Sequence, residues 1–332
     1  MSLRQRATYL SYRAAWGLAA ALPDAVAWRL PGPLGYLSYH LVSDRRRDQV
    51  RANFRRVAGD PPPEELERLV QAVFASYSRY WLDAFRAHTF SVEDVMARTE
   101  QVGLEIIEDL LADGEGIVLA TGHLGSWDMG GFFAESRDWH LSVVAEVVEP
   151  RALFERFVRL RRELGMDVIP LEEGGSSVDR LEQVVHSGGI ATLLADRDLT
   201  GNGPVVDFFG EPCRLPPGPA ALARRTGRPI VPGAFFTTPH GWRAVVHEPL
   251  DISGLDVEAG TQQVALALER LIGEAPHQWH VIVPHWLADR EPDHPALQDR
   301  AEDTPAPPDR AGDTPAPPGD EQAKSSQPPS SP

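Results

Sequence analysis

The chain of 332 residues has a single cysteine, Cys213. It therefore cannot form an intramolecular disulfide, and a metal site built on several cysteines is excluded. Basic residues are also scarce, because 32 of them stand against 48 acidic residues and the net charge is -16. That balance argues against a nucleic-acid-binding protein with a broad basic surface. We also find no spacing of histidine and carboxylate side chains that favours a metal site.

The sequence lacks the run of about 20 mostly apolar residues that a membrane-spanning helix needs. The best candidate, residues 9–30, is interrupted by Arg13, Pro23, Asp24 and Arg29. Arg13 also divides the apolar core that a secretory signal peptide would require.

The first sixty residues are nevertheless unusual. They hold ten arginines against four acidic residues, and the first forty contain four tyrosines and two tryptophans. Aromatic rings beside arginines are typical of helices that lie on anionic lipid. We therefore expect residues 1–60 to form a basic, aromatic-rich helical region that docks on an anionic membrane surface. The alternative is an ordinary helix pair whose aromatic rings pack on the core.

The end of the chain differs in composition from the rest. The decapeptide at 299–308 recurs with one change at 309–318, and large apolar side chains are almost absent from residue 298 onward. Such a segment buries too little surface to offset the entropy of ordering it. We expect residues 298–332 to be a disordered Pro-rich tail and residues 1–297 to form a single domain.

Short apolar runs and helical patterns alternate through the middle of the chain. Flanking glycine and proline predict strands at 116–122, 141–146, 167–171, 189–196, 229–236 and 243–247. Helices are predicted between them at 126–136, 151–164, 176–186, 218–226 and 261–273, and another runs from about Pro63 to Ala87. This alternation predicts an α/β fold with a largely parallel sheet flanked by helices, in which ligands bind beyond the carboxyl ends of the strands.

A candidate catalytic pair follows the first of these central strands. Asp128 stands five residues after His123. Five residues along one helix turn through about 500°, so the two side chains can meet only if His123 lies on the loop before the helix. The carboxylate would then fix the imidazole tautomer and stabilise the imidazolium once a proton is taken. The alternative is a core histidine bonded to a neighbour.

The same loop offers groups that can hold a ligand. Gly122 and Gly125 allow the backbone to approach it closely, and Ser126 is a candidate N-cap of the next helix. The free N–H groups at the start of that helix are suited to a developing oxyanion or a phosphate.

Motifs for rival chemistries are missing. Ser126 lacks the two glycines of a G-x-S-x-G elbow, and the chain has neither a G-x-G-x-x-G nor a Walker loop. With no evident serine or cysteine nucleophile, the simplest chemistry is a general base that activates a bound hydroxyl. That hydroxyl would attack an activated acyl group directly.

Three segments together resemble a known family. They are Thr121-Gly-His-Leu-Gly-Ser-Trp-Asp128, Ala195-Asp-Arg-Asp198 and the stretch DFFGEPCRLPPGPAALA at 207–223. They are similar to the bacterial lysophospholipid and lipid A biosynthesis acyltransferases, and most similar to the actinobacterial enzymes that acylate phosphatidylinositol mannosides. The resemblance implies that His123 and Asp128 are the catalytic pair. It also implies acyl-CoA as the donor and a mannose hydroxyl of phosphatidylinositol mannoside as the acceptor.

Glu146 and Arg161 help to choose among these relatives. Glu146 ends a predicted strand where lipid A enzymes tend to carry Arg-Pro, and Arg161 lies on the following helix. The mannoside enzymes are similar in placing a glutamate and an arginine around the acceptor and catalytic pocket. A carboxylate suits sugar hydroxyls, whereas an arginine suits a phosphorylated sugar. The alternative is a structural ion pair.

A second strand end carries Asp196, Arg197 and Asp198. These side chains could orient the base, contact the acceptor or hold the sheet edge together, and we rank Asp196 and Arg197 above Asp198. The late cluster of Trp279, His280, His285 and Trp286 is interpreted as a cap on the core, because tryptophan is mostly buried.

We therefore expect an acyltransferase without a cofactor that lies peripherally on the cytoplasmic face of the inner membrane. Its His123 would deprotonate a sugar hydroxyl while Asp128 orients the imidazole. Two alternatives remain open. One keeps the fold but takes a lysophospholipid or lipid A-type acceptor with acyl carrier protein as donor. The other is a non-catalytic lipid-binding membrane module in which His123 is structural.

Overall fold

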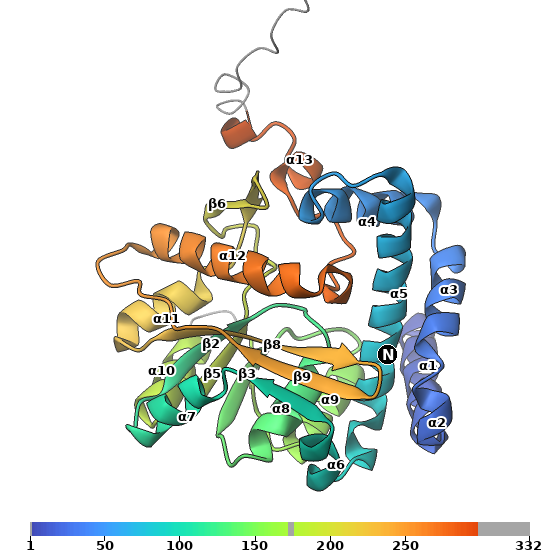
Figure 1. Cartoon of the computed structure of the whole chain (residues 1–332), viewed down its shortest axis with the longest axis horizontal. Helices are drawn as coiled ribbons and strands as arrows, with labels where there is room; N and C mark the ends of the chain where they lie inside the picture. The colour runs from blue at the N-terminus through green and yellow to red at the C-terminus, as the bar shows by residue number, and fades with distance from the viewer. Residues whose placement is uncertain (1, 172–175, 298–332) are drawn as a thin grey trace, which may run out of the picture.

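The computed structural model describes residues 2–171 and 176–297 (Figure 1). The predicted tail at 298–332 lies outside these residues. The described part of the chain has a central sheet with helices on both faces, which confirms the predicted α/β class.

The main sheet has seven strands in the order β1-β9-β8-β2-β5-β3-β4. The strands β8, β2, β5, β3 and β4 run parallel to one another, whereas β9 runs antiparallel to β8 and pairs with β1 at the edge. A separate two-stranded hairpin is formed by β6 and β7. The strands are β1 (Thr99–Val102), β2 (Ile117–Thr121), β3 (Leu141–Ala145), β4 (Asp167–Pro170), β5 (Ile190–Leu194), β6 (Val205–Phe208), β7 (Glu211–Arg214), β8 (Ile230–Thr238) and β9 (Gly241–Val246).

Helices cover the sheet in two layers. On one face lie α10 (Ser176–His186), α11 (Gly218–Thr226) and α12 (Val257–Glu274), and on the other lie α7 (Glu105–Ala112), α8 (Trp127–Glu135) and α9 (Arg151–Glu163). The remaining helices are α1 (Leu3–Ala21), α2 (Asp24–Ala27), α3 (Pro31–Leu41), α4 (Asp44–Val57), α5 (Pro63–Arg86), α6 (Val92–Ala97), α13 (Leu287–Arg290) and the 3-10 turns η1 (Ala87–Thr89) and η2 (Pro276–Gln278).

The six predicted strands and the predicted central helices occur where the sequence indicated. Strand β2 is a run of apolar residues in which Ile117 and Val118 are fully buried, as expected for a strand covered on both faces. The long helix α5 begins at Pro63 with Glu64 and Glu65 in its first turn, where a fixed φ and negative charge favour the helix start. Strand β1 and the β6–β7 hairpin were not predicted, because polar and charged residues interrupt them and leave no continuous apolar run.

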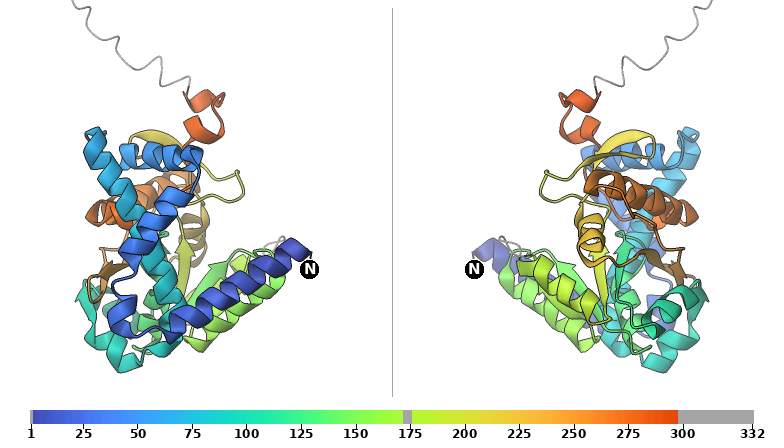
Figure 2. Two further views of the ribbon diagram at one scale, coloured as in Figure 1. Left: turned by 90° about the vertical axis from the view of Figure 1, so that its right-hand side faces the viewer. Right: turned by 90° about the vertical axis from the view of Figure 1, so that its left-hand side faces the viewer.

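The N-terminal helices lie side by side at one margin of the molecule. Figure 2 shows α1 extending along α9, and the Tyr12 and Trp16 rings of α1 contact Phe157 of α9. Trp16 and Tyr39 are buried and Tyr12 is half-buried. These three rings therefore pack on the core, as the alternative prediction has it, whereas Tyr36 is 65% exposed and membrane docking stays a prediction.

Most of the other exposed apolar side chains of these helices are leucines. Leu3, Leu10 and Leu18 of α1 are 85%, 57% and 71% exposed. At 100° per residue these three side chains fall within an arc of about 80° on α1. Exposed Arg6 and Arg13 lie on the adjoining face. Within residues 2–171 and 176–297, no helix is both long and apolar enough to cross a bilayer.

Candidate active site

One large cavity opens at the carboxyl end of the parallel strands. It has a volume of about 670 Å³, within the range of small-molecule sites. Its walls include the following apolar side chains from α8 and from strands β2, β3 and β5: Phe133, Ala134, Leu119, Leu141, Val143, Ile190 and Leu194. The cavity therefore lies between α8 and the sheet and runs along the strands toward their amino ends.

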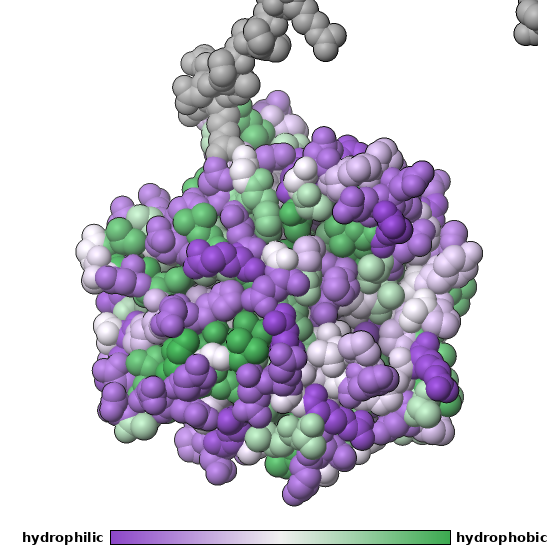
Figure 3. Space-filling view, viewed as in Figure 1, coloured by the Kyte–Doolittle hydropathy of each residue, from purple (hydrophilic) through white to green (hydrophobic). Residues whose placement is uncertain are grey.

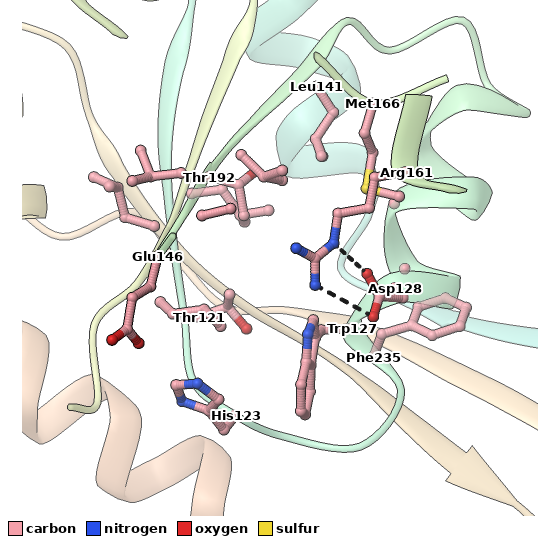
Figure 4. Close-up of a pocket in the computed structure, with 18 of the residues that line it drawn as sticks. Thr121, His123, Trp127, Asp128, Leu141, Glu146, Arg161, Met166, Thr192 and Phe235 are labelled. Atoms are coloured by element: carbon pink, nitrogen blue, oxygen red, sulfur yellow. Dashed lines mark hydrogen bonds and ion pairs between the residues drawn. The ribbon is translucent and has the colours of Figure 1, made fainter. Parts of the chain in front are cut away.

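Three charged or titratable side chains of the cavity lie at its mouth. His123 follows β2, Glu146 follows β3 and Arg197 follows β5, and all three line the cavity. They meet because the order β2-β5-β3 brings three parallel strand ends to one edge of the sheet. Figure 4 shows His123, Trp127 and Glu146 around this mouth, with Leu141 and Met166 farther in.

His123 is paired with Asp196. In the β2–β5 register Thr121 stands opposite Leu194, so His123 and Asp196 leave the two strands at equivalent positions. The Nδ1 atom of His123 lies 2.8 Å from Oδ1 of Asp196, and the backbone N–H of His123 donates to Oδ2 at 2.8 Å. A carboxylate on Nδ1 places the proton of the neutral ring there and leaves Nε2 free to accept one.

Asp196 is completely buried and stays ionised. Burial alone raises the pKa of this carboxyl group, but the His123 imidazole and backbone N–H and the Trp279 indole outweigh it and lower the pKa to about 2. The sequence left open whether Asp196 orients the base, and its contacts fit that role.

Asp128 has other partners. Its carboxylate accepts hydrogen bonds from the Tyr80 hydroxyl at 2.9 Å and from Nε of Arg161 at 2.7 Å. The hydrogen bond expected between Asp128 and His123 is not among the contacts of the described residues. The Trp127 ring stands between the two side chains, stacked on Tyr80 with ring centroids 3.8 Å apart and edge-on to His123.

The Asp128–Arg161 pair forms a fixed charge cluster. Asp128 is 1% exposed, and the Arg161 guanidinium holds it in a two-point contact. Burial lowers the pKa of Arg161, but the Asp128 carboxylate more than offsets this and raises it. Burial, with Asp128 adding to it, raises the pKa of Tyr80 well above its usual value, so its hydroxyl remains a donor. The Arg161 nitrogen that is not joined to Asp128 points into the cavity (Figure 4).

Two N–H groups of the glycine-rich loop are taken up by backbone hydrogen bonds. The N–H groups of Gly125 and Ser126 donate to the carbonyls of Gln278 and Phe235 at 2.9 Å and 2.8 Å. These two groups are therefore unavailable to an oxyanion, whereas the role expected for the first N–H groups of α8 itself stays a prediction. Ser126 occupies the N-cap position of α8, but its hydroxyl makes no cap hydrogen bond.

Two glycines of this loop are required by close contacts. A Cβ on Gly122 would stand 3.2 Å from the Asp196 carboxylate, so glycine lets that carboxylate reach His123. Gly125 has a φ of +57°, and a Cβ there would stand 2.2 Å from the Phe235 carbonyl oxygen.

Glu146, Arg197 and Asp198 were also predicted as site residues, and they differ in burial and contacts. Glu146 is exposed at the mouth, and Arg197 is half-buried there. Asp198 is buried and accepts hydrogen bonds from the backbone of Thr200 and Gly203, so it shapes the loop after β5. Among the described residues, no cluster of three or more histidine, cysteine or acidic side chains is arranged to hold a metal ion.

Three contacts of the site were not found from the sequence. Tyr80 lies 48 residues before Asp128, and Tyr12 of α1 lines the cavity, so no local spacing points to either. Trp279 was conspicuous but interpreted as core, and its indole N–H contacts Asp196.

Comparisons with known proteins identify the family of this chain. The model of the bacterial lipid A biosynthesis acyltransferase family matches residues 2–288. A phosphatidylinositol mannoside acyltransferase of Mycobacterium tuberculosis is 37% identical over 292 residues, which cover 87% of this chain and 91% of that protein. A protein of the same name from Mycolicibacterium smegmatis is 36% identical over 85% of this chain and 92% of its own. A lipid A biosynthesis acyltransferase of Haemophilus influenzae is 20% identical over 79% of this chain and 82% of its own.

Proposed function

The chain belongs to the bacterial lipid A biosynthesis acyltransferase family and is an acyltransferase, and from that premise we propose its substrates and its mechanism. The proposed reaction moves a fatty acyl chain of the palmitoyl type from acyl-CoA to a mannose hydroxyl of a phosphatidylinositol mannoside. The observation that carries this proposal is the long apolar cavity whose mouth holds the His123–Asp196 pair.

The cavity suits the acyl chain of the donor. Its interior is lined by aliphatic and aromatic side chains, so a methylene chain placed there leaves water at a gain of about 0.8 kcal/mol per buried CH₂. A chain that enters from the mouth leaves its thioester carbon beside His123. CoA itself would remain outside the cavity, because the interior offers few polar partners.

The base acts from the Nε2 atom of His123. It takes the proton of the sugar hydroxyl while Asp196 stabilises the imidazolium that forms. The sugar oxygen attacks the thioester carbonyl, the C–S bond breaks, and the imidazolium returns its proton to the departing CoA sulfur. Each turnover forms one ester and one free thiol, and no covalent acyl-enzyme is required.

Arg161 is the proposed donor to the oxyanion. The loop N–H groups of Gly125 and Ser126 are occupied, whereas one Arg161 nitrogen faces the cavity. Asp128 then serves catalysis by fixing that guanidinium, rather than by orienting His123. Asp128 thus remains among the proposed catalytic residues, but it holds Arg161 instead of His123.

Glu146 is the proposed contact for the acceptor. Its carboxylate is exposed at the mouth on the side of His123, where a sugar hydroxyl would approach. Carboxylates accept hydrogen bonds from hydroxyls and repel phosphates, which favours an unphosphorylated mannose. The lipid A-type alternative would present a phosphorylated sugar to this same carboxylate.

We further propose peripheral docking on an anionic membrane through α1 and α3. The support is the exposed stripe of leucines with arginines beside it on α1, together with Leu37 and Leu41 of α3, which are 53% and 75% exposed. The face seen in Figure 3 is mainly hydrophilic, and these helices lie at its margin in Figure 1.

Docking can be tested by vesicle sedimentation. A Leu3→Gln, Leu10→Gln, Leu18→Gln variant should lose binding to vesicles that contain anionic lipid. The matched control is Leu266→Gln, an exposed leucine of α12 that is 38% exposed. Equal binding by both variants would show that α1 is not the docking element.

The substrates can be tested with a panel of acceptors. Purified enzyme is incubated with palmitoyl-CoA and mannosylated phosphatidylinositol, a lysophospholipid or a lipid A precursor, and product mass and CoA release are followed. We expect acylation of the mannolipid alone. Transfer to another acceptor would replace the proposed one, and replacement of palmitoyl-CoA by palmitoyl-acyl carrier protein tests the alternative donor.

A further inference from the structure

Trp279 lies directly behind the proposed base. It follows η2, its ring is completely buried, and its indole Nε1–H donates to Oδ2 of Asp196 at 2.8 Å. The ring packs among aromatic neighbours, with centroid distances of 5.9 Å to Phe54 and 6.0 Å to Phe208. Packing alone would be served by any large apolar ring, so the hydrogen bond is the informative feature.

That bond helps to set the rotation of the carboxylate. Oδ2 of Asp196 accepts two hydrogen bonds, from the Trp279 indole and from the backbone N–H of His123. With Oδ2 held from two directions, Oδ1 is left facing Nδ1 of His123. The indole therefore reaches the imidazole through one intervening carboxylate.

The same segment also holds the backbone of the catalytic loop. The N–H of His280 donates to the carbonyl of His123, and the carbonyl of Gln278 accepts from Gly125, each at 2.9 Å. The Gln278 side chain in turn binds the backbone of Thr237 on β8. Residues 278–280 thus connect the loop after β2 to strand β8 by hydrogen bonds, and Trp279 is the middle residue of this segment.

We propose that Trp279 is a positioning residue for the acyl transfer, which acts by holding the Asp196 carboxylate in the orientation that binds His123. The inference rests on the proposed function, because it assumes that His123 is the base. It replaces the interpretation of this tryptophan as core filling only.

Other titratable groups surround the pair and remain unchanged when Trp279 is replaced. His280, His285 and Cys213 interact with Asp196, and Arg197 and Arg290 interact with His285. Burial lowers the pKa of both histidines and raises the pKa of the cysteine, so all three are uncharged near neutral pH. Asp198 lies two residues beyond Asp196 and is bound by its own loop.

The test compares Trp279→Phe with Trp286→Phe. Both tryptophans are completely buried in one aromatic cluster, and both indoles donate a bond of 2.8 Å. Trp286, however, donates to the backbone carbonyl of Phe208 instead of to Asp196. Trp286→Phe therefore loses the same ring volume and the same kind of donor, but it removes no hydrogen bond from the His123–Asp196 pair.

We expect Trp279→Phe to lower kcat at least about tenfold, because small misplacements of a catalytic group are costly, while KM for the mannolipid changes less than about twofold. The acidic limb of the kcat profile should move to lower pH. A carboxylate that is no longer held toward Nδ1 of His123 stabilises the imidazolium less. Trp286→Phe should change neither quantity by as much.

A variant that keeps the ring size protects the test against misfolding. Incorporation of 3-benzothienylalanine at position 279 replaces the indole N–H by sulfur at nearly constant volume. It should reproduce the kcat loss and the shifted acidic limb. Equal kcat losses at positions 279 and 286 with an unmoved acidic limb would show a merely structural role and overturn the inference.

The inference and the proposed function fail in different ways. Full activity of Trp279→Phe beside an inactive His123→Ala refutes the inference alone. Full activity of His123→Ala refutes the proposed base. The inference can be tested even if the wild type does not acylate the mannolipid. NMR of ¹³C-labelled histidine then follows the titration of the His123 ring, which depends on the Trp279–Asp196 hydrogen bond. The same titration midpoint in Trp279→Phe and in the wild type would overturn the inference.

Discussion

Two buried histidines should make folding of this protein sensitive to acid. His280 is 6% exposed and His285 is 1% exposed. Burial lowers the pKa of His280 to about 3 and that of His285 to about 4. In the unfolded chain each side chain regains its usual pKa of about 6.5. Between about pH 6.5 and pH 4 the unfolded chain binds protons that the folded chain does not, so the free energy of unfolding falls as the pH falls.

The size of the effect follows from these values. At pH 5 both histidines are almost fully protonated in the unfolded chain and neutral in the folded one. Lowering the pH from 7.5 to 5 therefore removes about 2 kcal/mol of stability per histidine, about 4 kcal/mol for the two. Asp196, with a folded pKa of about 2, adds nothing here, because it is ionised in both states. Its contribution is lost only below about pH 4, as the pH approaches the folded value.

Urea unfolding at pH 7.5 and pH 5, followed by tryptophan fluorescence, measures the loss directly. His280→Gln and His285→Gln each remove one titrating group, so each variant should lose about 2 kcal/mol less than the wild type between the two pH values. The exposed His88→Gln serves as the control and should behave as the wild type. Equal losses in all four proteins would refute the account of buried neutral histidines. The same curves show how far an activity loss in acid reflects unfolding rather than protonation of His123.

Two further predictions concern the cavity. Arg161→Met removes the guanidinium from the buried Asp128 carboxylate and leaves the Tyr80 hydroxyl as its side-chain donor among the described residues. Chemical denaturation should show a loss of about 3–5 kcal/mol, against about 1–3 kcal/mol for Tyr80→Phe. A smaller loss for Arg161→Met than for Tyr80→Phe would contradict the buried ion pair. Ala134 lines the cavity about 9 Å along α8 from Asp128. In competition assays Ala134→Phe should therefore shift the preferred donor from palmitoyl-CoA to a shorter acyl-CoA. An unchanged preference would show that the acyl chain does not lie beside Ala134.

Much of the fold could be predicted from the sequence, because buried parallel strands leave a local signature. The run at 117–121 is apolar, short and bounded by glycines, and it forms β2 in the middle of the sheet. Strand β1 and the β6–β7 hairpin contain polar and charged residues and so lack such an apolar run.

The candidate base could also be located from sequence, but its partner could not. Asp128 was chosen because it lies near His123 along the chain, whereas Asp196 is brought to His123 by the pairing of β2 with β5. The sequence shows that two strands end in polar residues. It does not show which strands are neighbours or in which register, and the Tyr80 and Trp279 contacts depend on the same long-range packing.

The central claim is that His123 activates an acceptor hydroxyl for direct attack on the thioester. Rapid-quench mixing of the enzyme with palmitoyl-CoA, first without and then with mannosylated phosphatidylinositol, tests it most directly. We predict no burst of CoA before the acceptor is added, and afterwards equal amounts of CoA and acylated mannolipid, both absent with His123→Ala. A burst of CoA equal to the enzyme concentration with the acyl group on the protein, or undiminished transfer by His123→Ala, would contradict the claim.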